Sequence, residues 1–213
     1  MSIFFYSIDF LKGLCQPMTH KKNPKEKKIQ ILKALNQCLQ EKPFDKTSIK
    51  DIARVAGVNH GLLHYYFKNK EDILTQYISY VIDHYKSMFN GWLSAVEPQS
   101  ISEKELIEKF FSFMNSRITL NKNLSKVFIE IWEIAAYNAN IRSILQQAYR
   151  EWIDTLGQML NMVAKNEAAT RQISIATVAF LEGMALFSII LEPDTFDFNQ
   201  VLTGFQKKII ASL

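Results

Sequence analysis

The residues best suited to chemistry lie in the segment 59–67, NHGLLHYYF, which is predicted to be a short helix. Leu63 and Phe67, spaced i, i+4, define an inward apolar face. The opposite face then carries an amide and aromatic rings that can form hydrogen bonds, and Gly61 permits close approach of another molecule. A helix of this kind can read base edges in the DNA major groove. The residues predicted to contact bases are Asn59, His60, Leu62 and His64.

Each of these side chains also has another interpretation. An asparagine can pair with adenine, a leucine can cover a thymine methyl and a histidine can donate to guanine or to a phosphate. Asn59 is equally well placed to cap the helix, and both roles stay open. His60 and His64 match half of a helical zinc site, but no nearby carboxylate or cysteine completes it and the HExxH glutamate is missing. We therefore expect no metal and no other cofactor.

A preceding helix is predicted to position this segment. Ser48 and Asp51 form a capping box that begins a helix ending at Ala56, and Gly57 suits a turn that needs positive φ. Hydroxyl groups and free amides at helix starts, and a lysine at the start of the next helix, are suited to DNA phosphates. A half-buried core ring is the alternative for Tyr66. The residues predicted to contact phosphates are Thr47, Ser48, Tyr65, Tyr66 and Lys70.

Several short motifs follow one another between Thr47 and Leu74: T-S-I-x-D-I-A, A-G-V, G-x-L-x-x-Y-F and K-x-K-E-x-x-L. In this order and spacing they resemble the helix-turn-helix of the tetracycline-repressor (TetR) family of bacterial transcription regulators, over about residues 25 to 75. The resemblance implies a phosphate contact for Lys70. The chain departs from the family at three positions where members commonly have serine, threonine and tyrosine, so the resemblance implies the fold but not the DNA sequence preference. The departing residues are Asn59, Leu62 and His64.

Charge is distributed unevenly along the chain. Residues 18–70 hold twelve Lys and Arg against four Asp and Glu, a net of +8, whereas residues 71–213 hold twelve against sixteen, a net of −4. A basic segment on an acidic body is typical of a polyanion-binding module, although a solvated lysine-rich surface has the same composition. Because the motif falls inside the basic segment, we predict that this segment binds DNA.

The hydrophobic periodicity predicts an all-α protein of about nine helices, with no strand pattern. Residues 18–69 are predicted to form a helix-turn-helix head and residues 70–213 a helical effector-binding and dimerisation body. Residues 1–17 are an apolar extension that lies upstream of a natural start at Met18 or packs on the surface. Cys38 reads as a buried hydrophobe, and the two cysteines suit a reducing cytoplasm. The predicted helices are 24–41, 48–56, 59–67, 70–92, 102–120, 124–137, 141–164, 170–191 and 198–213.

The segment Thr170–Leu191 is apolar on almost every side, so it must be buried all round. Burial against a second copy of the chain, together with Phe198–Leu213, is favoured over burial inside one copy. The resemblance also implies a homodimer paired through its last two helices and a near-palindromic operator in double-stranded DNA.

The body is richer in aromatic and thioether side chains than a minimal bundle needs, and the resemblance implies a pocket for a small-molecule effector. Taken singly, each of these residues could be ordinary core. The candidate pocket residues are Phe110, Phe113, Met114, Arg117, Phe128, Trp132, Tyr149 and Trp152.

No motif supports an enzyme, because the glycine-rich phosphate loop, the G-x-S-x-G elbow and H-E-x-x-H are all missing. The resemblance implies a cytoplasmic repressor, not bound to a membrane, whose effector tilts the fourth helix and so releases DNA. The alternative is a helical small-molecule-binding protein in which the head is only a scaffold.

Overall fold

A computed structural model describes residues 23–96, 101–164, 166–192 and 194–212. Within them the chain forms nine α-helices and no strand, which confirms the all-α prediction. The apolar extension 1–17, including Cys15, lies outside the described residues. The helices are α2 (Pro24–Glu41), α3 (Ile49–Ala56), α4 (His60–Tyr66), α5 (Lys70–Ala95), α6 (Glu103–Met114), α7 (Lys122–Tyr137), α8 (Ala139–Ala164), α9 (Glu167–Ile190) and α10 (Phe198–Ser212).

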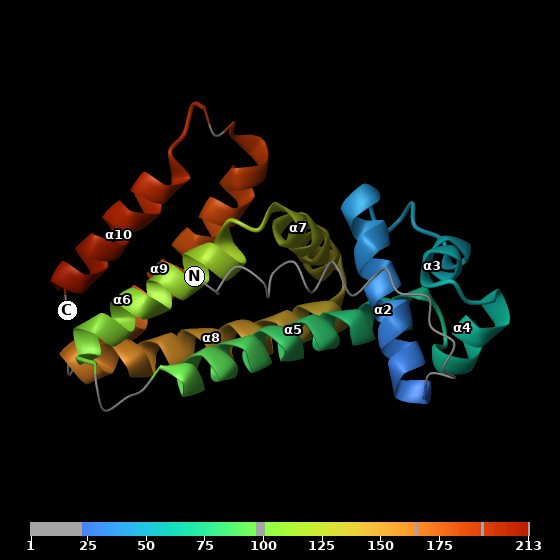
Figure 1. The fold of residues 1–213 in the computed structure, drawn as a ribbon, viewed down its shortest axis with the longest axis horizontal. Coiled ribbons are helices and arrows are strands. Elements are labelled where there is room, and N and C mark those ends of the chain that lie inside the picture. The colour runs from blue at the N-terminus through green and yellow to red at the C-terminus, as the bar shows by residue number, and fades with distance from the viewer. Residues whose placement is uncertain (1–22, 97–100, 165, 193, 213) are drawn as a thin grey trace.

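The first three helices form a small head at one end of an elongated molecule (Figure 1). The predicted cap of α3 is confirmed, because Ser48 Oγ accepts from the Asp51 amide and Asp51 accepts from the Ser48 amide. The predicted turn is confirmed as well, since Gly57 has φ +61 and ends α3 in the left-handed region, where a side chain would be strained. These local signals set the angle between α3 and α4.

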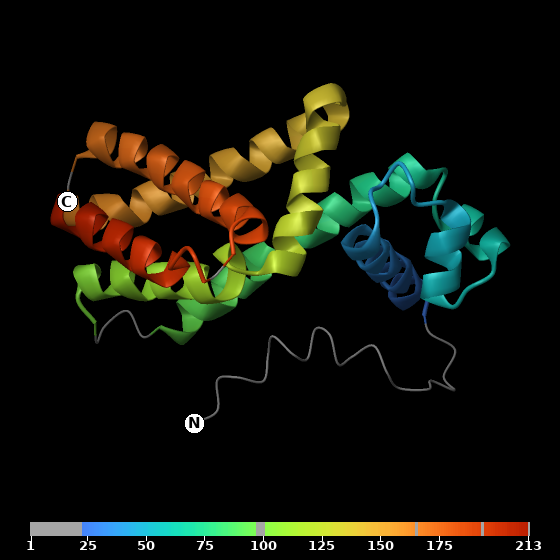
Figure 2. The ribbon, with the colours of Figure 1, turned by 90° about the horizontal axis from the view of Figure 1, so that it is seen from above.

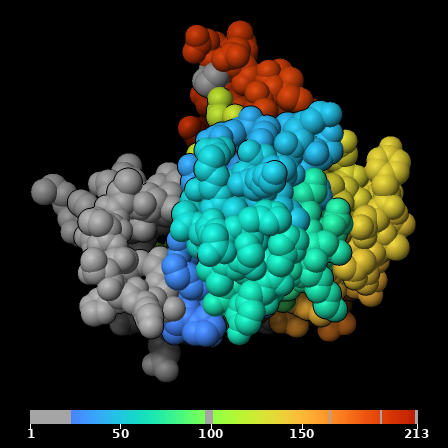
Figure 3. Space-filling model, turned by 90° about the vertical axis from the view of Figure 1, so that its right-hand side faces the viewer, coloured from blue at the N-terminus to red at the C-terminus, as the bar shows by residue number. Residues whose placement is uncertain are grey.

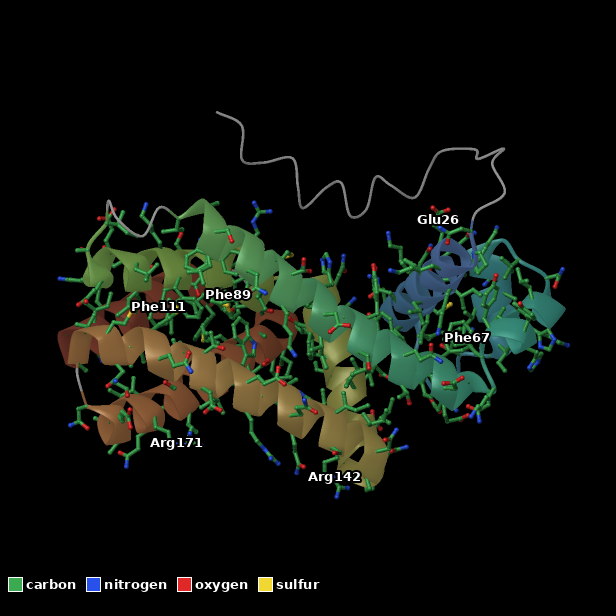
Figure 4. The ribbon with its side chains drawn as sticks, turned by 90° about the horizontal axis from the view of Figure 1, so that it is seen from below. Glu26, Phe67, Phe89, Phe111, Arg142 and Arg171 are labelled. Carbon is green, nitrogen blue, oxygen red and sulfur yellow. The ribbon has the colours of Figure 1, made fainter. Side chains whose placement is uncertain are left out.

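One long helix joins the head to the body. The first three turns of α5 carry Ile73, Leu74 and Tyr77 into a core that α2, α3 and α4 share with α7 and the start of α8, and all three are almost fully buried. The remainder of α5 continues into the body, where Phe89 belongs to a second hydrophobic core (Figures 1 and 2). Figure 4 shows Phe67 inside the head, near the start of α5, and Phe89, a residue of α5, inside the body. The helix therefore packs into both cores.

The body contains α6 to α10, and α8 and α9 form its most extensive helix pair. The predicted helix 102–120 ends earlier than expected: α6 stops at Met114 and residues Asn115–Thr119 form a π-helical turn, η1. A π turn cannot be distinguished from continued α-helix by hydrophobic spacing, because both keep apolar residues on one side. Such turns occur frequently at functional sites.

The apolar helix α9 is buried on one side only. Ser174 is fully buried where α9 meets Gly157 of α8. On its other side Ile175 is 47%, Phe187 47% and Ile190 65% exposed. By length and composition alone, α9 could cross a membrane. Core helices of folded proteins can have the same length and composition. One copy of the chain therefore leaves this side of α9 uncovered.

Candidate DNA-contacting surface and ligand cavity

Helix α4 presents a polar face at the free end of the head. Leu63 is 1% and Phe67 3% exposed, so the predicted inward face is confirmed. His60 and His64 are exposed on the other side, with their rings in edge-to-face contact at 4.6 Å between centroids. Figure 3 views the molecule from this end, where the head forms the nearest surface. The two imidazoles form one continuous hydrogen-bonding surface.

The structure assigns Asn59 a capping role. Its Oδ1 accepts from the Leu62 amide at 2.8 Å, while the side chain remains exposed. The cap fixes the amide group beside Gly61 and leaves Nδ2 and the second lone pair of Oδ1 for a base. Leu62 is half-buried at the edge of the same face. The four predicted base-contacting residues thus lie on or beside one exposed turn of helix.

The predicted phosphate contacts do not all lie at the surface. Thr47 is only 1% exposed, and its hydroxyl donates to the Pro43 carbonyl at 3.0 Å. This corrects the assignment of that hydroxyl to a phosphate: it closes the loop before α3 instead. Ser48 is exposed, but its hydroxyl donates to Asp51 at 2.7 Å. The hydrogen bonds that Ser48 and Lys42 donate to Asp51 lower the pKa of its carboxyl.

Tyr65 and Lys70 differ in how firmly the protein holds their side chains. Tyr65 is 77% exposed and lies beside the half-buried ring of Tyr66, which packs against the head core. Lys70, at the first position of α5, donates from Nζ to the Phe44 carbonyl at 2.9 Å, and Nζ lies 4.2 Å from the centroid of the Phe44 ring. An ammonium has three donors, so this contact positions the lysine and leaves donors for another oxygen.

A cavity of about 420 Å³ lies in the body. Its size falls within the range of small-molecule sites, and most of its lining is apolar. Both residues of the π turn that reach it, Ile118 and Thr119, lie between α6 and α7. The hydroxyl of Thr119 is buried without a hydrogen-bond partner. Helix α5 contributes one wall of the cavity through Ile82, Tyr85, Lys86, Phe89, Asn90 and Leu93.

Of the eight predicted pocket residues, five line this cavity: Met114, Phe128, Trp132, Tyr149 and Trp152. Phe110, Phe113 and Arg117 do not. Phe110 is 2% exposed within an aromatic cluster with Phe89, and Phe113 stacks on Trp92 at 5.2 Å. Helix α6 turns these rings toward the body core rather than toward the cavity, a rotation that composition does not reveal.

The sequence-based prediction missed the most informative polar group of the cavity. The Trp132 indole donates to the Tyr149 hydroxyl at 2.8 Å, and that hydroxyl donates to Glu182 Oε1 at 3.0 Å. Burial raises the pKa of Glu182 to about 7. The available signal was the single carboxylate in the middle of an otherwise apolar helix. An ion pair between Lys86 and Glu151 joins α5 to α8 at the cavity wall.

Comparison with known proteins agrees with this arrangement. The sequence pattern of bacterial regulatory proteins of the tetR family matches residues 31–77, and that of the C-terminal part of BetI-type transcriptional repressors matches residues 104–207. The fatty acid metabolism regulator protein of Bacillus subtilis (strain 168) is 26% identical over 144 residues, which cover 68% of this chain and 63% of that protein.

Solved structures share the fold. The regulator FadR from Bacillus subtilis in complex with stearoyl-CoA superposes with a TM-score of 0.63 at 19% identity, covering 87% of this chain and 98% of that one. A regulator from Saccharomonospora viridis in complex with choline gives a TM-score of 0.69 at 17% identity, covering 87% and 94%. With its helix-turn-helix head, its helical body and both sequence patterns, the chain belongs to the TetR family of DNA-binding transcription regulators.

Proposed function

We propose that this protein is a homodimeric cytoplasmic repressor that binds a near-palindromic operator and leaves it when a small molecule occupies the body cavity. One observation carries the proposal: α5 begins at Lys70, in the head, where Nζ contacts Phe44, and further along the same helix lines the cavity with six side chains. A rigid helix that reaches both places can transmit a shift from one to the other.

The mechanism follows from the geometry of that helix. A ligand packed against Tyr85, Phe89 and Leu93 bears directly on the second half of α5. Because the first half of α5 packs against α2, α3 and α4, a tilt of α5 would turn the head with it, against α7. In a dimer this alters the spacing of the two α4 helices. The ligand thus shifts the population toward a dimer shape whose α4 helices no longer match the operator, and the DNA is released.

Phosphate and base contacts are expected to have different roles. Lys70, Ser48 and the tyrosine pair would hold the head on the DNA backbone without selecting sequence. The exposed imidazoles of His60 and His64 would select bases, since each can donate to guanine N7 or O6. Thr47 is excluded from this set by its burial.

Dimerisation is proposed through α9 and α10. The exposed side of α9 presents Ile175, Phe187 and Ile190, a larger apolar surface than isolated exposed residues would give. A second copy would cover it by twofold symmetry, which matches the symmetry of a near-palindrome.

The ligand is proposed to be compact and largely apolar. The two bound ligands of related structures, stearoyl-CoA and choline, differ in size and charge, so the relatives support the presence of an effector without selecting its class. The aromatic lining favours a molecule with apolar groups.

Selection of bound fragments from the source genome with the purified protein tests this function. Recovery of a near-palindrome whose half-sites lie a helical turn or more apart, with a log–log salt slope of several units, is the expected result. Failure to retain any fragment at low salt would instead favour the protein in which the head is only a scaffold. A cavity ligand should then shift the recovered operator to the unbound state.

A further inference from the structure

Glu182 is a largely buried acid in the wall of the cavity. It lies in α9 among apolar neighbours, and its side chain lines the cavity. None of the ion pairs between described residues involves it. A carboxylate removed from water and given no cation is costly, so its ionised form requires compensation from elsewhere.

The hydrogen bonds of Glu182 orient it without neutralising it. The Trp132 indole donates to the Tyr149 oxygen at 2.8 Å, so the hydroxyl proton of Tyr149 points to Glu182 Oε1, 3.0 Å away. This relay fixes one carboxyl oxygen. Tyr149 is the hydrogen-bond donor to Glu182 among the described residues, and it reaches Oε1 rather than the second oxygen, Oε2. The relay therefore leaves one acceptor of a fixed acid for whatever occupies the cavity.

Aromatic rings surround the same space. The faces of aromatic rings attract organic cations, and the attraction strengthens when the cation is desolvated. The other charged residues of the lining, Lys86 and Glu151, pair with each other, so their charges cancel and Glu182 determines the net charge. The aromatic residues that line the cavity are Tyr85, Phe89, Phe128, Trp132, Tyr149 and Trp152.

We propose that the cavity selects a lipophilic organic monocation, an alkyl- or arylammonium compound, whose charged group lies against Glu182 Oε2 and whose substituents pack on the aromatic rings. This rests on the proposed function, because it names the ligand class of the same effector cavity. An anionic ligand would place its charge beside that of Glu182, and a neutral one would leave the acid without a counter-charge.

Three probes of similar size separate the possibilities. Benzyltrimethylammonium is the cation, neopentylbenzene is its neutral carbon isostere and 4-phenylbutanoate is an anion. Binding to the full-length protein is measured by titration calorimetry at pH 8, with the fluorescence of Trp132 and Trp152 as a second readout because both line the cavity. The cation is expected to bind at least tenfold more tightly than its isostere. Equal affinities, stronger binding of the anion, or no binding of the cation at millimolar concentration would overturn the proposal.

Two isosteric variants assign the selectivity to one carboxyl. Glu182→Gln is expected to bring the cation within about twofold of the neutral isostere, because the amide keeps the shape and removes the charge. Glu133→Gln is the matched control: it removes a carboxyl at an exposed position of α7, outside the cavity lining, and leaves the Lys86–Glu151 pair intact. It should retain most of the tenfold preference. Selectivity that survives Glu182→Gln, or falls equally in both variants, would show that Glu182 does not recognise the cation.

A third variant tests the same recognition in case Glu182→Gln does not fold. Trp132→Phe keeps an aromatic ring but removes the indole donor to Tyr149, so the acid is oriented less firmly. A several-fold loss of cation affinity, with unchanged affinity for neopentylbenzene, is expected. An equal loss for both probes would indicate general cavity damage and count against the relay.

Operator release separates this inference from the function on which it rests. If the cation binds selectively but does not weaken operator binding, the ligand class stands and the proposed release mechanism fails. If only the neutral or anionic probe releases the operator, the release mechanism stands and the cation assignment fails.

Discussion

The backbone N–H of Phe44, in the loop between α2 and α3, donates to Glu130 Oε2 on α7 at 2.9 Å. The carbonyl of the same Phe44 accepts from Lys70 Nζ at 2.9 Å. The residue before Glu130 on α7, Ile129, lines the cavity. Phe44 thus connects the cavity wall on one side to the predicted phosphate-binding lysine on the other, a second link between body and head besides α5.

Removing this link should weaken communication between ligand and DNA. In Glu130→Ala the Phe44 amide loses a charged acceptor, so the head is held to α7 by apolar packing alone. We expect the ligand-induced loss of operator affinity to shrink by about fivefold, a coupling change of about 1 kcal/mol. Operator titrations with and without ligand measure it. Glu133→Ala, on an exposed position of the same helix, is the control, and an equal effect there would rule out the specific link.

Lys70→Ala should weaken binding to all DNA sequences alike. The lysine is positioned by Phe44 rather than by any base-reading residue, so its removal takes away one phosphate contact. The slope of log K against log salt should fall by about 1. Salt-dependent binding to operator and random DNA measures this. Lys104→Ala, on an exposed position of α6 in the body, should leave the slope unchanged.

His64→Ala should relax sequence preference at one base-pair position. The exposed ring lies against His60, so the two imidazoles act as neighbouring readers of adjacent base edges. A loss of about 1–3 kcal/mol in discrimination is expected at that position. Sequencing of selected oligonucleotides measures it. Tyr65→Phe is the contrast, since loss of a phenol should lower affinity without changing the selected sequence.

Glu182→Gln should stabilise the ligand-free protein at high pH. The pKa of Glu182 in the folded state, about 7, exceeds the ordinary value of 4.5, so folding favours the protonated form. The contribution of Glu182 to the stability of the folded protein is therefore greatest below pH 4.5. This contribution is lost as the pH rises toward and beyond 7. Above that pH the cost of the ionised acid is about 3 kcal/mol, which the glutamine avoids.

Thermal unfolding of both proteins at pH 5.5 and pH 8 measures this difference. The variant should exceed the wild-type Tm by several degrees at pH 8 and by less at pH 5.5. The rest of the cavity lining is the same in both proteins, so the comparison isolates the carboxyl of Glu182. A larger advantage at the lower pH would contradict the raised pKa.

Phe187→Glu should separate the proposed dimer. The side chain is 47% exposed on the uncovered face of α9, where a second copy would bury a charge without a partner. We expect the dimer dissociation constant to rise by at least a hundredfold and operator affinity to fall with it, as measured by sedimentation. Tyr137→Glu provides the control, because that ring is 90% exposed at the end of α7. If the Tyr137→Glu dimer dissociated as readily as the Phe187→Glu dimer, the effect would not be specific to α9 and the proposed interface would be wrong.

The sequence by itself determined the helices of the head and their ends. Ser48 with Asp51, Gly57 and Asn59 act on neighbours three or four residues away, so their effects follow from local spacing. The inward pair Leu63 and Phe67 and the basic charge of the head were likewise predictable. Each depends on residue type and helical period rather than on distant partners.

Only the tertiary structure decided which aromatic rings line the cavity and which fill the core. Phe110 and Trp152 have the same character in the sequence, but helix rotation buries the first and turns the second to the cavity. The relay from Trp132 to Glu182 joins residues 50 positions apart on α7, α8 and α9. The burial of Thr47 depends in the same way on how its loop closes. Contacts between helices depend on their packing angles, which hydrophobic periodicity within one helix does not specify.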